Sequence, residues 1–332
     1  MFELNWGLPV IGYLFLAGAG AGALTVSSSV LLRGGGGGFG GAHFKVARYG
    51  ALAAPVLLII GTALIVLELG TFKAAVAHGD WALLFRWLNL FKVINLSPMS
   101  IGSWALLAAI LASVAYAYTF LPGNKADDRM KSLRRGLAWI GVPLGIIVGI
   151  YTGVLLGAMP SRPLWNSPVL AALFLVSAIS TGLATILLIK AVFDRDKKRT
   201  SENTAGTHFI KEDRSTYLLT ASDLLLIGLE LVAVFLFIMF AQLTIGAPAE
   251  AMKVLFPGGE MATLFWFGFV VVGLLLPVAV ELRYVLPTLL NHQPYSIPVA
   301  IEVLVSSLIL IGGFVLRYVI VIAGQITYPI GL

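Results

Sequence analysis

Long hydrophobic segments alternate with short polar segments along the 332 residues of the chain. Eight hydrophobic segments are long enough to cross a bilayer, which takes about 20 apolar residues. Backbone groups in lipid must bond to one another, so each segment is predicted to be a helix. The pattern predicts an all-α integral membrane protein with eight transmembrane helices and one membrane domain, 1–332. The predicted spans are about 7–32, 47–70, 98–121, 137–158, 167–191, 217–245, 261–287 and 298–325.

The positions of lysine and arginine predict the orientation of these spans. Most of these residues lie after the first, third and fifth spans, with runs at 125–135 and 195–199. Cytoplasmic loops are enriched in lysine and arginine. We therefore expect these loops in the cytoplasm and both termini on the outer, periplasmic side. The net charge of +6 is then an orientation signal and does not indicate nucleic-acid binding.

The longest predicted outer loop, 71–97, contains aromatic residues at helical spacing. They include Trp81, Phe85 and Phe91. This spacing predicts a helix that lies in the outer membrane interface. Such a helix is either an aromatic anchor or the floor of a site for a membrane-soluble ligand.

Composition narrows the chemistry that this protein can perform. Hydrophobic residues make up 59% of the sequence and charged residues 11%, against about 25% charged in soluble domains. There is no cysteine, which excludes disulfides and a thiolate-held iron–sulfur cluster. The four histidines lie in or beside predicted loops, so we expect no haem within the membrane. A redox role would need a diffusible quinone and a neighbouring subunit that holds the metal cofactors.

One group of polar and aromatic residues is predicted near the outer membrane face. Tyrosine hydroxyls and carboxylates there suit a quinone, because they can bond to its carbonyls and exchange its protons. The alternatives are interfacial anchoring of single side chains and an ion pair between Glu68 and Arg317. The candidate quinone-binding residues are Tyr13, Glu68, Met99, Ser100, Tyr151, Arg162 and Trp165.

A second group of ionisable residues is predicted toward the cytoplasmic half of the spans. Ionisable residues within a bilayer are costly and often functional. They are interpreted either as a proton path toward the outer site or as a structural network that holds the helices together. The residues of this group are Asp223, Glu230, Glu281, Arg283 and Glu302, with Arg317 nearer the outer side.

The sequence resembles the NrfD family of membrane subunits in several motifs that occur in order from the first to the last span. These are Tyr13–Gly18, Ser97–Gly102, Tyr151–Leu156, Ser180–Gly182 and Leu316–Tyr318 with Ala323–Gln325. One motif differs. Where the family often has Asp-Leu-Gly-Arg-Pro, this protein has Glu68-Leu69-Gly70-Thr71-Phe72, so a role for an arginine at that place is in doubt.

The resemblance implies two four-helix bundles and a quinol site near the outer face, with Tyr151 in contact with the quinone. It also implies an iron–sulfur partner with four [4Fe-4S] clusters, which relays electrons to or from a catalytic subunit of the molybdopterin type. We therefore expect a quinone-binding anchor subunit (for menaquinone or ubiquinone) in a bacterial or archaeal cytoplasmic membrane. The protein would not be a stand-alone enzyme. The alternatives are a proton-coupled secondary transporter and a structural anchor without a quinone site.

Overall fold

A computed structural model describes most of the chain. The described residues are 6–34, 43–68, 75–76, 78–81, 85, 88, 91, 97–124, 127–193, 214–291 and 297–327. The long elements among them are α1 (Leu8–Arg33), α2 (Phe44–Glu68), α5 (Pro98–Tyr118), α6 (Asp128–Gly157), α7 (Pro168–Phe193), α9 (Arg214–Leu243), η3 (Leu264–Leu275) continued by α11 (Leu276–Asn291), and α12 (Val299–Ile326). Two short elements, α10 (Ala247–Met252) and η2 (Lys253–Leu255), follow α9.

Eight helices in this part of the chain are long and apolar enough to cross a membrane, with η3 and α11 forming one of them. The predicted all-helical architecture is confirmed, and eight long helices agree with eight membrane spans. Within 71–97 only residues 75–76, 78–81, 85, 88, 91 and 97 are described, so the predicted interfacial helix as a whole lies outside the described residues.

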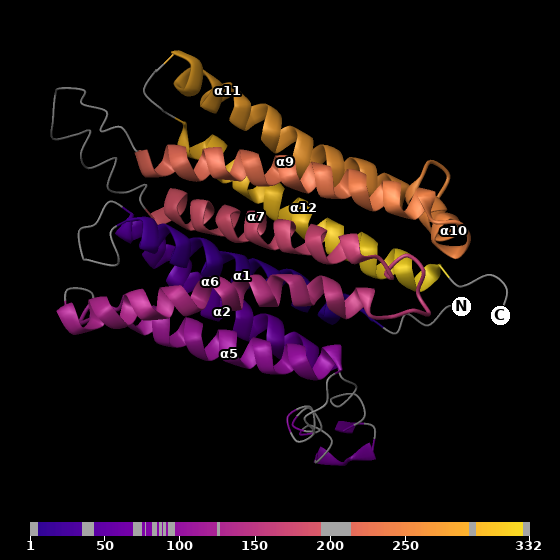
Figure 1. Ribbon diagram of the computed structural model, residues 1–332, viewed down its shortest axis with the longest axis horizontal. Helices are drawn as coiled ribbons and strands as arrows, with labels where there is room; N and C mark the ends of the chain where they lie inside the picture. The colour runs from indigo at the N-terminus through magenta and orange to yellow at the C-terminus, as the bar shows by residue number, and fades with distance from the viewer. Residues whose placement is uncertain are drawn as a thin grey trace.

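Helix α1 lies in the middle of the molecule, against α2, α6 and α7 (Figure 1). In its most apolar stretch 83% of the residues are buried, against 33–61% in the other seven spans. The other helices therefore present a larger share of apolar side chains to the surroundings, as lipid-facing helices do. Helix α7 contacts α1 and α6 as well as α9 and α12. The division into two four-helix bundles stays a prediction.

Glycines bring α1 and α7 into backbone contact. A Cβ atom on Gly22 would lie 1.8 Å from the carbonyl oxygen of Ala178. A Cβ atom on Gly182 would lie 2.2 Å from the backbone nitrogen of Ala23. Such small residues allow membrane helices to approach closely, and no side chain larger than hydrogen fits at either position.

The seventh long helix begins as a π-helix, η3, before it continues as α11. Its first part is apolar on all sides, and hydrophobic periodicity cannot distinguish helix types in such a segment. The sequence therefore predicts a helix here but not its π form. A Cβ atom on Gly273 would lie 2.6 Å from the Cα atom of Gly312 in α12. This close packing joins η3 to α12.

The start of α5 is set by local hydrogen bonding. The backbone N–H of Ser100 donates to the side-chain oxygen of Ser97 at 3.3 Å, and Pro98 stands in the first turn. Both features are favoured where a helix begins, because the first N–H groups have no partner within the helix. These contacts fix the start of α5, the helix that carries Met99 and Ser103.

Both described ends of the chain lie at the same end of the molecule (Figure 1). An even number of spans requires this arrangement. Which side of the membrane that end faces stays a prediction from the lysines and arginines.

Candidate functional site

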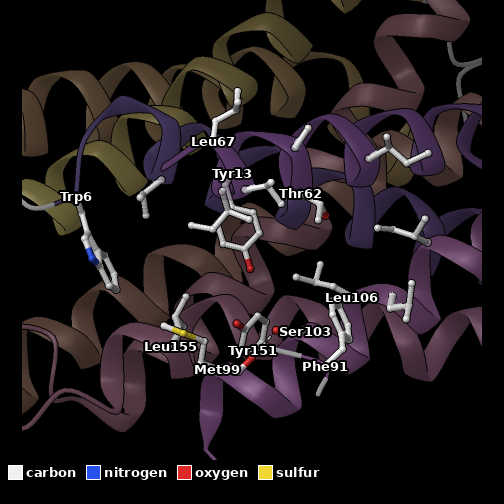
Figure 2. A pocket seen from close by; sticks show the side chains of 17 residues that line it. Trp6, Tyr13, Thr62, Leu67, Phe91, Met99, Ser103, Leu106, Tyr151 and Leu155 are labelled. Carbon is white, nitrogen blue, oxygen red and sulfur yellow. Dashed lines mark hydrogen bonds between the residues drawn. The ribbon is translucent and has the colours of Figure 1, made fainter. Parts of the chain in front are cut away.

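A cavity of about 660 Å³ lies between α1, α2, α5 and α6 (Figure 2). Among the described residues, seventeen side chains line it, and none of these is charged. Ligand pockets typically have volumes of about 300–1,000 Å³ with mostly apolar walls and a few polar groups. The polar lining residues are Trp6, Tyr13, Thr62, Ser103 and Tyr151.

Two tyrosine hydroxyls belong to this wall. Tyr13 comes from α1 and Tyr151 from α6, and their hydroxyl groups interact with each other. The hydroxyls of Thr62 and Ser103 donate at 2.8 Å to the carbonyl oxygens of Leu58 and Met99 in their own helices. Their hydrogens are thus already engaged. One tyrosine can donate to the other, which leaves a phenolic hydrogen for an oxygen atom of a ligand.

Tyr151 occupies its place because residue 102 has no side chain. A Cβ atom on Gly102 of α5 would lie 1.8 Å from the ring of Tyr151. That distance is far below a van der Waals contact, so any other residue at position 102 would displace the ring. Gly102 belongs to a motif on which the family resemblance rests, but only the packing of α5 on α6 shows its effect on Tyr151.

The structure brings three of the predicted quinone-binding residues together in the cavity wall: Tyr13, Met99 and Tyr151. Ser100 is buried on α5 and does not line the cavity; Ser103, one turn further, does. The side chain of Glu68, the last residue of α2, lies outside the described part of the chain.

Trp165 and Arg162 lie beside the cavity wall, in the connection between α6 and α7. The Trp165 ring stacks on the Trp6 ring with centroids 5.3 Å apart, and its Nε1–H donates to the carbonyl oxygen of Ile320 at 2.7 Å. Arg162 donates to the carbonyl oxygen of Gln325 at 2.8 Å. Neither residue lines the cavity, but both contact groups that lie next to it.

The buried acidic residues form a second polar cluster, among α7, α9 and α11. Ser180 of α7 donates to Asp223 Oδ1 of α9 at 3.4 Å, and the carboxyl groups of Asp223 and of Glu281 in α11 interact with each other. Glu230, two turns after Asp223, interacts with Ser177 of α7. All three acids are at most 3% exposed. The sequence predicts all three toward the cytoplasmic half of their spans, and the structure places them in one cluster of buried polar residues.

Arg317 of α12 is fully buried and belongs to the same set of polar contacts. Its Nη1 donates to Ser177 Oγ and to the carbonyl oxygen of Gly313, both at 2.7 Å. Glu230 supplies an opposite charge nearby. The guanidinium group also lies over the rings of Phe15 and Phe174. Arg317 thus connects the acidic residues to α1, the helix that carries Tyr13.

The two remaining members of the predicted proton path differ in their exposure. Glu302 is buried near the start of α12. Arg283 is exposed on α11. The structure therefore brings Asp223, Glu230, Glu281 and Arg317 together and leaves Arg283 outside the cluster.

Several residues of the cavity are missing from the sequence-based set. Trp6, Thr62 and Ser103 all line it. Trp6 precedes the first predicted span, and the other two resemble many residues in an apolar helix. Phe91 also lines the cavity, and it is one of the outer-loop aromatic residues whose spacing predicts either an anchor or the floor of a ligand site. Helical spacing could have added Ser103, because it lies one turn beyond Met99 on the same helix.

Comparison with known proteins identifies the family of the protein. The family model described as "Polysulphide reductase, NrfD" matches residues 2–329. A polysulfide reductase component from Wolinella succinogenes is 31% identical over 338 residues, which span 96% of this sequence and 94% of that protein. Protein NrfD of Escherichia coli is 27% identical over 98% of this sequence and 96% of its own length. A selenate reductase component from Mesobacillus selenatarsenatis is 24% identical over 82% of this sequence and 66% of its own length.

The family match extends from before α1 to beyond α12, so it includes both the cavity and the buried acidic cluster. The eight apolar helices agree with a membrane subunit that crosses the bilayer several times. The chain belongs to the NrfD family of polysulfide reductase membrane subunits.

Proposed function

We propose that this protein is the quinone-reactive membrane subunit of a respiratory reductase complex. The observation that supports this proposal most strongly is a cavity in which the described lining residues are uncharged and the hydroxyls of Tyr13 and Tyr151 interact with each other. A quinone head group is an apolar ring with two carbonyl oxygens, so it suits an apolar wall with phenolic hydrogen-bond donors. Quinol would bind among α1, α2, α5 and α6.

The cavity wall supports entry of the ligand from the lipid. Ile59 and Leu67 of α2 and Met99 of α5 line the cavity and are 47%, 52% and 40% exposed. Each of these side chains lines the cavity and is also partly exposed on the surface of the protein, which in a membrane protein contacts lipid. The long apolar tail of a quinone could therefore leave the cavity between α2 and α5 and remain in the bilayer.

Oxidation of a quinol releases two electrons and two protons. The sequence has no cysteine to hold an iron–sulfur cluster, so the electrons must pass to another subunit. Two relatives are named as single components of multi-subunit reductases. We propose an iron–sulfur partner with four [4Fe-4S] clusters on the outer face, linked to a catalytic subunit of the molybdopterin type. Tyr151 would bond to a quinol oxygen, and Glu68 would exchange the protons.

This function is tested in the purified complex with the variant Tyr151→Phe. The variant keeps the ring and removes one hydrogen bond, so we expect the KM for quinol to rise about three- to tenfold, the range expected from losing one neutral hydrogen bond. The measurement is quinol oxidation with a dye as electron acceptor. The matched control is Tyr318→Phe on α12, which removes a hydroxyl that does not line the cavity.

A complex that contains no quinone, and whose quinol oxidation is unchanged in Tyr151→Phe and Glu68→Gln, would contradict the proposal. That result would favour a structural anchor without a quinone site.

A second candidate function is proton movement through the buried acidic cluster. The observation that favours it is the series of contacts from Glu281 through Asp223 and from Glu230 to Arg317, which continues to α1. Carboxylates that share hydrogen bonds can pass a proton between them. The cluster would then connect the cytoplasmic half of the membrane with the quinone cavity, or serve a proton-coupled transporter.

A further inference from the structure

The C-terminal end of α12 holds Trp6, which lies two residues before the start of α1. The backbone N–H of Trp6 donates to Gln325 Oε1 at 2.9 Å, and Gln325 Nε2 donates to the carbonyl oxygen of Trp6 at 2.9 Å. One side-chain amide thus satisfies both backbone groups of a residue that lies 319 positions away in the sequence. Gln325 is 6% exposed, so water competes little for these bonds.

The ring of Trp6 is held from one side by Trp165. The two rings are stacked with an interplanar angle of 24°. Trp165 is itself fixed, because its Nε1–H is bonded to Ile320 and its ring covers Gly324, where a Cβ atom would lie 1.8 Å from Nε1. Arg162 lies with its guanidinium carbon 5.9 Å from the Trp165 ring centroid and bonds to the carbonyl oxygen of Gln325.

Trp6 also lines the cavity between α1, α2, α5 and α6, at the edge that Figure 2 shows opposite Phe91. Gln325 and Trp165 do not line that cavity. We infer that Gln325 and Trp165 are positioning residues that hold Trp6 as a wall of the quinone site. The inference rests on the proposed quinone function and adds specificity-determining residues to it.

A physical reason supports this role. A residue before the first turn of a helix is normally free to move unless it is tied to the rest of the fold. A binding wall that is already ordered does not have to be ordered when the ligand binds, so affinity is higher. Loss of the contacts to Trp6 should therefore weaken quinone binding without slowing the electron-transfer step.

The test uses the full-length protein purified in lipid nanodiscs, with menadione and decyl-ubiquinone as probes. A quinone beside a tryptophan quenches its fluorescence, and the sequence has seven tryptophans. Titration gives the dissociation constant, and Trp6→Phe identifies the part of the quenching that arises from Trp6. We expect Gln325→Ala and Trp165→Leu each to raise the dissociation constant about five- to tenfold, since each removes a main support of Trp6.

In the assembled complex the same two variants should raise the KM for quinol and leave kcat unchanged. The matched control is Ser307→Ala on α12, which loses only a hydrogen bond to Val303 within its own helix. Wild-type affinity and quenching in both Gln325→Ala and Trp165→Leu would overturn the positioning role. If the unaltered protein shows no saturable quenching by either quinone, the proposed quinone function itself is overturned.

Discussion

At the scale of single residues, the cavity depends on one glycine as much as on its tyrosines. Tyr13, Met99 and Tyr151 could be selected from the sequence, because polar and aromatic side chains at one membrane depth are conspicuous in an apolar protein. Gly102 could not be selected on that ground, because 36 glycines occur in the sequence. Its importance arises from a contact with the Tyr151 ring, which only the packing of α5 on α6 creates.

We predict that Gly102→Ala impairs quinol oxidation at least as strongly as Tyr151→Phe. The added methyl group would lie 1.8 Å from the Tyr151 ring, so the ring must leave its place in the wall. The KM for quinol should rise about tenfold or more, because a misplaced ring loses both its hydrogen bond and its packing. The measurement is steady-state quinol oxidation by the complex.

The matched control for this prediction is Gly136→Ala in α6, where an added Cβ atom meets nothing within 4 Å. It should leave the KM unchanged. A wild-type KM in Gly102→Ala would show that the position of the Tyr151 ring does not matter for binding.

At the scale of elements, the contact between α1 and α7 determines how the helices are arranged. The existence of both helices is evident from their apolar length, and their small residues predict close packing. Which helix each one packs against could not be predicted, because small residues also occur in other spans. The structure shows that Gly22 and Gly182 lie at the point where the two backbones meet.

We predict that Gly182→Ala destabilises the protein. Its Cβ atom would lie 2.2 Å from the backbone nitrogen of Ala23, so the helices must move apart. Overpacking of this kind typically costs about 1–3 kcal/mol. Thermal unfolding in nanodiscs should show a lower transition temperature.

Gly228→Ala in α9 is the matched control, since an added Cβ atom there has no neighbour within 4 Å. Alanine favours a helix over glycine, so this variant should be at least as stable as the unaltered protein. Equal transition temperatures for the two variants would contradict a tight α1–α7 contact.

At the scale of the whole molecule, α1 connects two polar regions. Its residue Tyr13 faces the cavity, and its residue Phe15 lies with its ring centroid 5.8 Å from the guanidinium carbon of Arg317. Arg317 contacts Ser177, which also interacts with Glu230. The sequence assigns Arg317 to the outer part of its span, whereas the fold connects it to the acidic residues of α9.

We predict that Asp223→Asn together with Glu281→Gln abolishes proton movement without abolishing quinol oxidation. Both substitutions keep the size of the side chain and remove the exchangeable carboxyl proton. The measurement is pH change inside proteoliposomes that contain the complex, while quinol is oxidised by an added acceptor. Arg283→Gln, on the exposed side of α11, is the control and should behave like the unaltered complex.

Unchanged proton movement in the double variant would assign the cluster a structural role. Thermal unfolding checks this structural role. If the cluster only holds the helices together, the double variant should unfold at a lower temperature than the unaltered protein, because its hydrogen bonds have changed.

The sequence by itself determined the membrane class, the number of long helices and the absence of cysteine ligands, and it singled out the two tyrosines of the cavity wall and the buried acidic residues. These features follow from local composition and from the length that a bilayer demands of each span. The tertiary structure alone decided which helices touch, how Gly102 admits Tyr151, and how Gln325 reaches Trp6. Those contacts join residues far apart in the sequence, and their geometry depends on backbone approach at glycines that local patterns cannot rank.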